Sequence, residues 1–75
     1  MEIREVLAAN IKRYRRTAGL SQEELALRAG VDRTYISAIE RCRYSASVDV
    51  LDRIARELGV DAAALLTRPS TEFGE

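Results

Sequence analysis

Apolar residues recur along this chain at the three- and four-residue spacing of α-helices, and no segment alternates in the manner of a half-buried strand. The first pattern predicts a helix over roughly residues 2–17. The face expected to be buried consists of Leu7, Ile11, Tyr14 and Ala18. Gly19 is predicted to end this helix, because glycine readily adopts the left-handed conformation found just after a helix end.

A second helix begins at a strong local signal. Ser21 and Glu24 have the S-x-x-E spacing of a capping box, and Leu20 and Leu25 flank it as an apolar pair. Gly30 is predicted to end this helix after about two turns. The residues expected to face inward are Leu25, Ala26 and Ala29.

A third helix is predicted from Arg33 to about Arg41, because Asp32 supplies a capping oxygen directly before it. Its inner face consists of Ile36 and Ile39, and Val31, which precedes the capping residue, is expected to face inward with them. Its outer face consists of Arg33, Thr34, Ser37, Ala38 and Arg41. This outer face is small, polar or basic, and it lacks the bulky apolar groups that pack in a core.

After a loop over residues 42–46, Ser47 is predicted to cap a fourth helix that ends at Gly59. The inward residues of this helix are Leu51, Ile54, Ala55 and Leu58. A short fifth helix is predicted from Ala62 to Leu66. Val60 and Leu65 are expected to pack internally in this last part of the domain.

The five predicted helices form one compact all-α domain over residues 1–66. Residues 67–75 contain Pro, Gly and polar residues without a period, and they are expected to form a flexible tail. The second and third helices, joined through Gly30, have the arrangement of a helix-turn-helix.

Composition excludes several classes of function. The chain has 75 residues with no His and one Cys, so the commonest general base and the usual metal-ligand clusters are missing. We therefore expect no enzyme activity, no metal site and no cofactor. The longest apolar runs are far too short to span a membrane, so we expect a cytoplasmic protein with no membrane partner.

Charge is balanced over the whole chain, with 12 Lys plus Arg and 12 Asp plus Glu, but it is unevenly distributed. Residues 1–43 carry nine basic and six acidic groups, whereas residues 44–75 carry three and six. Such asymmetry is consistent with a face that binds a polyanion beside a face with another task.

Several runs of residues resemble the helix-turn-helix family of phage Cro and CI repressors, the lambda-repressor-like fold. They are Gly19 to Ala26 (GLSQEELA), Ala29 to Val31, Tyr35 to Ser37 and Ile39 to Arg41. The likeness covers about residues 8–66, because it continues through Ser47, Leu51, Ile54-Ala55, Leu58-Gly59-Val60 and Leu65-Leu66. A narrower likeness, over Asp32 to Ser37 and Ile39 to Arg41, is to the controller proteins of restriction-modification systems. The resemblance implies a homodimeric regulator that binds palindromic double-stranded DNA and associates with the nucleoid in a bacterial or phage-infected cell.

The outer face of the third helix has the side chains that a helix in the major groove needs. Arg33 has the two-pronged donor geometry for guanine O6 and N7, and Thr34 offers a methyl or a hydroxyl group. Ala38 keeps the helix close to the groove floor, and Tyr35 lies at the rim. The expected base contacts are Arg33, Thr34, Tyr35, Ser37 and Ala38.

The expected phosphate contacts are Gln22, Arg41, Arg43 and Ser47. Gln22 and Ser47 lie at helix N-termini, where free backbone N–H groups and the helix dipole attract anions. The resemblance also implies a structural ion pair between Arg15 and Glu40, so Glu40 is not a candidate catalytic acid.

The last predicted helix has more apolar surface than it can bury alone. Its expected dimer contacts are Ala62, Ala63 and Leu66. The alternative is a monomer in which this helix only covers the core. Cys42 departs from the pattern, because the position after a helix end usually holds Gly or Asn. We expect Cys42 to carry backbone strain or to shift the turn by one residue.

The function favoured by the sequence is a dimeric DNA-binding regulator with no small-molecule ligand, in which occupancy of the operator follows protein concentration alone. A restriction-modification controller and a general phage-type repressor both satisfy this description. A different class remains open, in which the domain is an antitoxin-like module that binds another protein.

Overall fold

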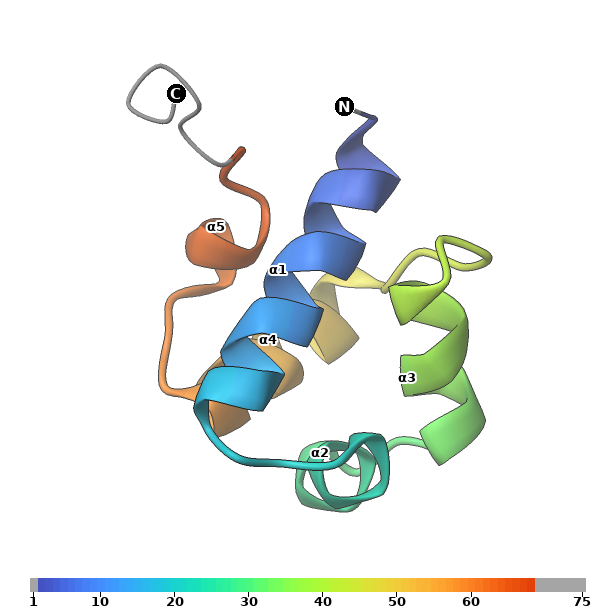
Figure 1. The fold of residues 1–75 in the computed structure, drawn as a ribbon, viewed down its shortest axis with the longest axis vertical. Coiled ribbons are helices and arrows are strands. Elements are labelled where there is room, and N and C mark those ends of the chain that lie inside the picture. Colours follow the sequence, from blue (N-terminus) through green and yellow to red (C-terminus); the bar gives the residue numbers. More distant parts are fainter. Residues whose placement is uncertain (1, 69–75) are drawn as a thin grey trace.

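The computed structural model describes residues 2–68, and these residues form five α-helices (Figure 1). They are α1 (Ile3–Thr17), α2 (Gln22–Ala29), α3 (Arg33–Glu40), α4 (Val48–Leu58) and α5 (Ala62–Leu65). The predicted all-α fold and its five helices are therefore confirmed. In Figure 1, α1 crosses the middle of the molecule, with α2 and α3 on one side and α5 on the other. None of the described helices is both long and apolar enough to cross a membrane.

Each of the five described helices contributes at least one fully buried side chain to the interior. One such side chain in each helix lies on a face that the sequence predicted to be inward and has no measurable exposure. They are Ile11, Leu25, Ile36, Ile54 and Leu65. Burial of large aliphatic side chains is the main favourable contribution to folding, so the five helices depend on one shared core.

The predicted inner face of α1 is wrong at its C-terminal end. Ala18 is exposed and forms the C-cap, because the helix ends at Thr17 and the chain turns away at Gly19. Val6 is fully buried, although the spacing pattern did not single it out. At the N-terminal end of α1, the buried face is thus wider than the face that a strict i, i+4, i+7 pattern predicts.

Four helices end in the same hydrogen-bonded turn, the Schellman motif. The N–H of the residue after the left-handed position donates to a carbonyl five residues earlier, as from Val31 to Ala26 at 2.9 Å and from Arg43 to Ala38 at 2.8 Å. Three of the left-handed positions hold glycine, and the fourth holds Cys42, with φ of 60°. Of the two alternatives expected for Cys42, the turn is not shifted by one residue; Cys42 itself takes the left-handed conformation, which is strained for a residue with a β-carbon.

The C-terminal end of α5 is fastened to α1 by a side chain that no sequence pattern singled out. Asn10 is buried, and its Nδ2 donates to the carbonyl oxygens of Leu65 at 3.0 Å and Thr67 at 2.9 Å. The hydroxyl of Thr67 also donates to the Ala63 carbonyl. The predicted tail included Thr67, whereas these bonds attach Thr67 to the domain; residues 69–75 of that tail lie outside the described residues.

Candidate nucleic-acid interface

The two faces of α3 differ as the sequence predicts. Ile36, Ile39 and Glu40 are buried against the rest of the domain. On the opposite face, Arg33 and Thr34 are exposed. The remaining predicted base contacts are partly buried: Tyr35, Ser37 and Ala38. The helix therefore presents a polar, basic surface that its own packing does not use.

The first turn of α3 is closed by Asp32. Its Oδ1 accepts hydrogen bonds from the Thr34 N–H at 3.0 Å and from the Thr34 hydroxyl at 2.9 Å. Both bonds lower the pKa of Asp32, and the bond from the backbone N–H has the larger effect. Because the Thr34 hydroxyl donates its hydrogen to Asp32, Thr34 can still offer a methyl group and acceptor lone pairs, but not a donor, to a base.

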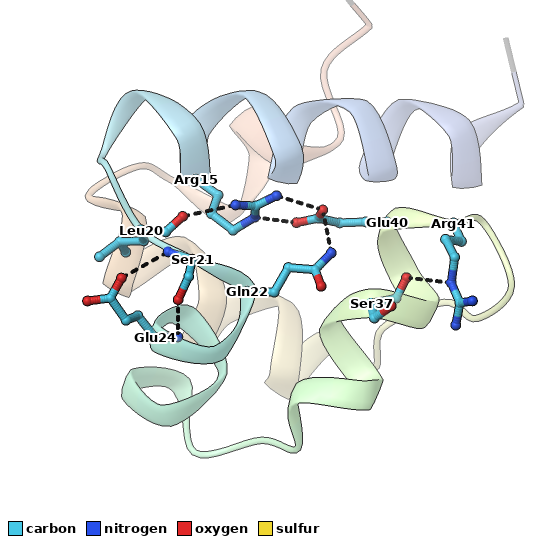
Figure 2. A network of polar contacts seen from close by, with 8 residues as sticks. All are labelled: Arg15, Leu20, Ser21, Gln22, Glu24, Ser37, Glu40 and Arg41. Carbon is cyan, nitrogen blue, oxygen red and sulfur yellow. Dashed lines mark hydrogen bonds and ion pairs between the residues drawn. The ribbon is translucent and has the colours of Figure 1, made fainter.

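The ion pair that the resemblance implies, between Arg15 and Glu40, is present in the structure (Figure 2). Two parallel hydrogen bonds join them, from Nε to Oε2 at 2.7 Å and from Nη2 to Oε1 at 3.0 Å. Arg15 also donates from Nη1 to the carbonyl oxygen of Leu20 at 2.9 Å. One guanidinium thus connects α1, the α1–α2 turn and the C-terminal end of α3.

Glu40 stays ionised in spite of its burial. Only 6% of the residue is exposed, and burial raises its pKa. Hydrogen bonds from Arg15 and Gln22, with the positive charges of Arg15 and Lys12, outweigh this effect, so the pKa of Glu40 lies below its usual value. The pKa of Arg15 is raised, chiefly by its hydrogen bond to Glu40. Both partners therefore keep their charges at neutral pH.

Gln22 also belongs to this network, a contact that no sequence pattern predicted. Its Nε2 donates to Oε1 of Glu40 at 3.0 Å, and Figure 2 shows its amide pointing toward the Arg15–Glu40 pair. An amide nitrogen carries two hydrogens, so one N–H of Gln22 remains for another acceptor. Gln22 and Glu40 are 18 positions apart, a separation at which helical spacing says nothing about contact.

The other expected phosphate contacts lie around α3. Ser47 caps α4, where its Oγ accepts from the Val50 N–H at 3.2 Å and keeps a hydroxyl hydrogen to donate. The Arg41 Nε donates to the Ser37 carbonyl at 3.3 Å, which folds Arg41 back along α3 (Figure 2). Arg43 is exposed in the following loop. Along the chain, the N-terminus of α2 precedes α3. The two arginines and the N-terminus of α4 follow it.

The expected dimer contacts differ in exposure. Ala62 is partly buried against the core, Ala63 is exposed, and Leu66 is 39% exposed. Leu66 borders an apolar hollow of about 210 Å³. The other residues that line this hollow are Ile3, Arg4, Leu7, Ser45, Ala46, Val48 and Leu51. The sequence pattern did not connect the start of α1 and the start of α4 with α5.

A family model described as helix-turn-helix matches residues 11–65 of this chain. A hypothetical transcription factor of Neisseria meningitidis is 46% identical over 68 residues, which are 91% of this chain and 64% of that relative. Control protein C.SmaI of Serratia marcescens is 41% identical over 68 residues, which are 91% of this chain and 81% of that protein.

Solved structures show the same similarity in three dimensions. The hypothetical transcription factor NHTF from Neisseria superposes with a TM-score of 0.90 and 42% identity, covering 97% of this chain and 84% of that chain. The restriction-modification controller protein C.AhdI from Aeromonas hydrophila superposes with a TM-score of 0.80 and 29% identity, covering 83% and 94%. The family match over most of the chain, together with these relatives, shows that this protein belongs to the helix-turn-helix family of DNA-binding transcriptional regulators.

Proposed function

We propose that this protein is a sequence-specific regulator of transcription that binds a palindromic operator as a homodimer and places α3 in the major groove. The observation that supports this proposal most directly is the exposed outer face of α3, held at one end by Asp32 and at the other by the Arg15–Glu40–Gln22 network. A helix fixed at both ends can present side chains to base edges in a constant register.

In this proposal the outer face of α3 reads the bases. Arg33 pairs with guanine through O6 and N7, and the methyl group of Thr34 contacts a thymine methyl. Ser37 and Ala38 are small enough to let the helix approach the groove floor, and Tyr35 lies at the rim. Each good two-pronged contact contributes about 1–3 kcal/mol of discrimination between bases.

The sugar-phosphate backbone of the DNA is bound by groups that precede and follow α3 in the chain. The free N–H of Gln22 at the start of α2 and the Ser47 hydroxyl at the start of α4 donate to phosphates, with the dipoles of their helices adding attraction. Arg41 and Arg43 add positive charge. Such contacts fix the register of the protein on DNA without reading sequence.

A second copy of the chain covers the apolar surface around Leu66, Ile3 and Val48. All three side chains are exposed and border the same hollow. Domains of this size gain stability from association. A two-fold arrangement would place two copies of α3 about 34 Å apart, one turn of DNA, and the operator of such a dimer would be palindromic.

The dimer is tested by Leu66→Asp, with Leu27→Asp as the matched control. Leu27 is 80% exposed on α2 and does not line the hollow, so its substitution should leave the sedimentation mass unchanged. Leu66→Asp should shift the mass toward that of one chain. An unchanged mass in the Leu66 variant would move the interface elsewhere.

The function is tested by sequencing the genomic fragments that the purified protein retains at physiological salt. The expected result is enrichment of one palindromic sequence. If no sequence is enriched, the DNA-reading proposal is wrong and the antitoxin-like module, which binds another protein, becomes the better explanation. The proposal includes no small-molecule ligand and no catalytic step.

A narrower candidate is a controller of a restriction-modification system. It is favoured by the similarity to Control protein C.SmaI and to the structure of the controller C.AhdI. Enrichment upstream of the protein's own gene, beside genes for a methyltransferase and an endonuclease, would support this candidate. Enrichment at other genes would support a general repressor.

A further inference from the structure

Two tyrosine rings meet at the edge of the outer face of α3. The centroids of Tyr35 and Tyr44 are 5.0 Å apart, and the ring planes make an angle of 76°. This is the edge-to-face geometry that aromatic pairs prefer. Tyr35 lies in the first turn of α3 and is partly buried, whereas Tyr44 lies in the loop before α4 and is 55% exposed.

The end of α3 brings Tyr44 to this position. Cys42 adopts a φ of 60°, its N–H donates to the Ile39 carbonyl at 3.0 Å, and the Arg43 N–H donates to the Ala38 carbonyl at 2.8 Å. These bonds reverse the chain directly after the helix. Tyr44 follows immediately, so the loop returns alongside α3 instead of continuing away from it.

The hydroxyl groups of both tyrosines are free within the described part of the chain. Neither makes a hydrogen bond to another group of residues 2–68. The ring of Tyr35 contacts the ring of Tyr44. The hydroxyl group of Tyr35 is available at the rim of the proposed DNA-reading face. A pair held only by its rings fixes orientation but leaves the polar ends for a ligand.

We infer that Tyr44 is a positioning residue for DNA recognition: its ring sets the orientation in which Tyr35 meets the DNA. The inference rests on the proposed function and deepens it, because it assigns a role in DNA recognition to a residue outside α3. A side chain already held in its bound orientation loses less conformational freedom on binding than a free one. Tyr44 acts through Tyr35 and does not itself read a base.

The experiment measures affinity for the operator, and for operators changed at one base pair at a time, with Tyr44→Leu, Tyr44→Phe, Tyr35→Leu and the double leucine variant. Tyr44→Leu should weaken operator binding about 2- to 13-fold, the cost of ordering one free side chain on binding converted to affinity. The loss should fall on the same base pair as that of Tyr35→Leu. The double variant should bind no worse than Tyr35→Leu alone.

Tyr44→Phe separates the ring from the hydroxyl group. It keeps the ring pair, so it should bind with the affinity of the unmodified protein. In the absence of DNA, the ring proton resonances of Tyr35 should shift in Tyr44→Leu and stay in place in Tyr44→Phe. A merely structural role of Tyr44 would lower stability without selecting one base pair.

Three results would overturn the inference while leaving the proposed function intact. These are additive losses from the two leucine substitutions, a loss spread evenly over all operator sequences, and a Tyr44→Phe variant as weak as Tyr44→Leu. The last two occurring together, with stability unchanged, would make Tyr44 a phosphate contact through its hydroxyl group. If the unmodified protein enriches no sequence at all, the proposed function fails and this inference fails with it.

Discussion

The two faces of α3 have opposite relations to the rest of the molecule. On the inner face, Ile36 and Ile39 fill the core and Glu40 is bonded to two other helices. On the outer face, Arg33 is exposed, and the hydroxyl group of Thr34 bonds to Asp32, two residues earlier in the chain. The inner face therefore determines where the helix lies, and the outer face determines what the helix can bind.

Gln22 takes part both in positioning α3 and in the proposed contact with DNA. One hydrogen of its amide is bonded to the buried carboxylate of Glu40, and the other is available to a phosphate in the proposed complex. The position of α3 and the proposed grip on DNA are thus coupled through one side chain. Substitutions on the inner face should therefore lower stability, whereas substitutions on the outer face should weaken DNA binding.

The largest effect is expected on the inner face, from Glu40→Ala. This substitution leaves the Arg15 guanidinium partly buried without its partner, which typically costs about 3–5 kcal/mol. Because a domain of this size has a total stability of roughly 3–5 kcal/mol, the variant should be largely unfolded. Far-ultraviolet circular dichroism without urea measures the lost helix content, and a urea titration measures the stability that remains.

The chain offers a matched control for Glu40→Ala in the exposed pair of Asp52 and Arg56 on α4, whose Oδ2 and Nε atoms are 3.1 Å apart. Asp52→Ala should cost only about 0.3–0.5 kcal/mol, because exposed helical ion pairs contribute little. Equal losses from Asp52→Ala and Glu40→Ala would contradict the central role given to the buried network.

Acid should weaken the same inner face without a substitution. The folded pKa of Glu40 lies below its ordinary value of 4.5, so its stabilising contribution is complete above that value and is lost as pH falls through the lower folded pKa. The loss should be smaller than in Glu40→Ala, because the protonated carboxyl group still fills its site.

The comparison of unmodified protein with Glu40→Gln isolates this contribution. Glu24 and Asp32 also have lowered pKa values, because each accepts hydrogen bonds at a helix N-terminus, and they titrate in both proteins. The free energy of unfolding should therefore fall more steeply between neutral and acidic pH in the unmodified protein. Parallel pH profiles would show that Glu40 contributes nothing to acid sensitivity.

On the outer face, Arg33→Ala should lower affinity for the operator by about 1–3 kcal/mol and relax the preference at one base pair in each half-site. Stability should change by less than about 0.5 kcal/mol, since Arg33 is exposed and away from the core. Binding to operators with single base changes measures the first effect, and urea titration measures the second.

Arg53→Ala provides the control for charge alone. Arg53 is exposed on α4 and lies outside the proposed contacts, so its substitution removes the same charge without removing a base contact. If both variants weaken all sequences to the same extent, Arg33 contributes only general electrostatic attraction to phosphates.

Apart from the control variants, the smallest effect is expected from Cys42→Gly, at the turn that follows α3. A residue with a β-carbon in the left-handed conformation costs roughly 1–2 kcal/mol compared with glycine. Part of this gain is offset by the greater freedom of glycine in the unfolded chain. We expect about 1 kcal/mol of added stability in urea titration, whereas a destabilised variant would mean that the Cys42 side chain makes contacts worth more than the strain.

The sequence determined the helices and their ends because those signals are local. Ser21 with Glu24, Asp32 with Thr34, and Ser47 with Val50 act over two or three residues, a separation at which helix geometry fixes the positions of both partners. The apolar spacing likewise predicts Ile36 and Ile39 on the inside of α3 and Arg33 on the outside, where the fold has them.

Contacts between side chains that are distant in the sequence depend on the packing of the helices. Gln22 bonds to Glu40, Asn10 holds the end of α5 more than fifty residues later in the chain, and Leu66 shares its hollow with Ile3 and Val48. The resemblance to a known family supplied the ion pair of Arg15 with Glu40, but not these contacts. Helical periodicity specifies the direction of a side chain around its own axis, whereas the partner it reaches depends on how the helices pack, and that is set by the whole core at once.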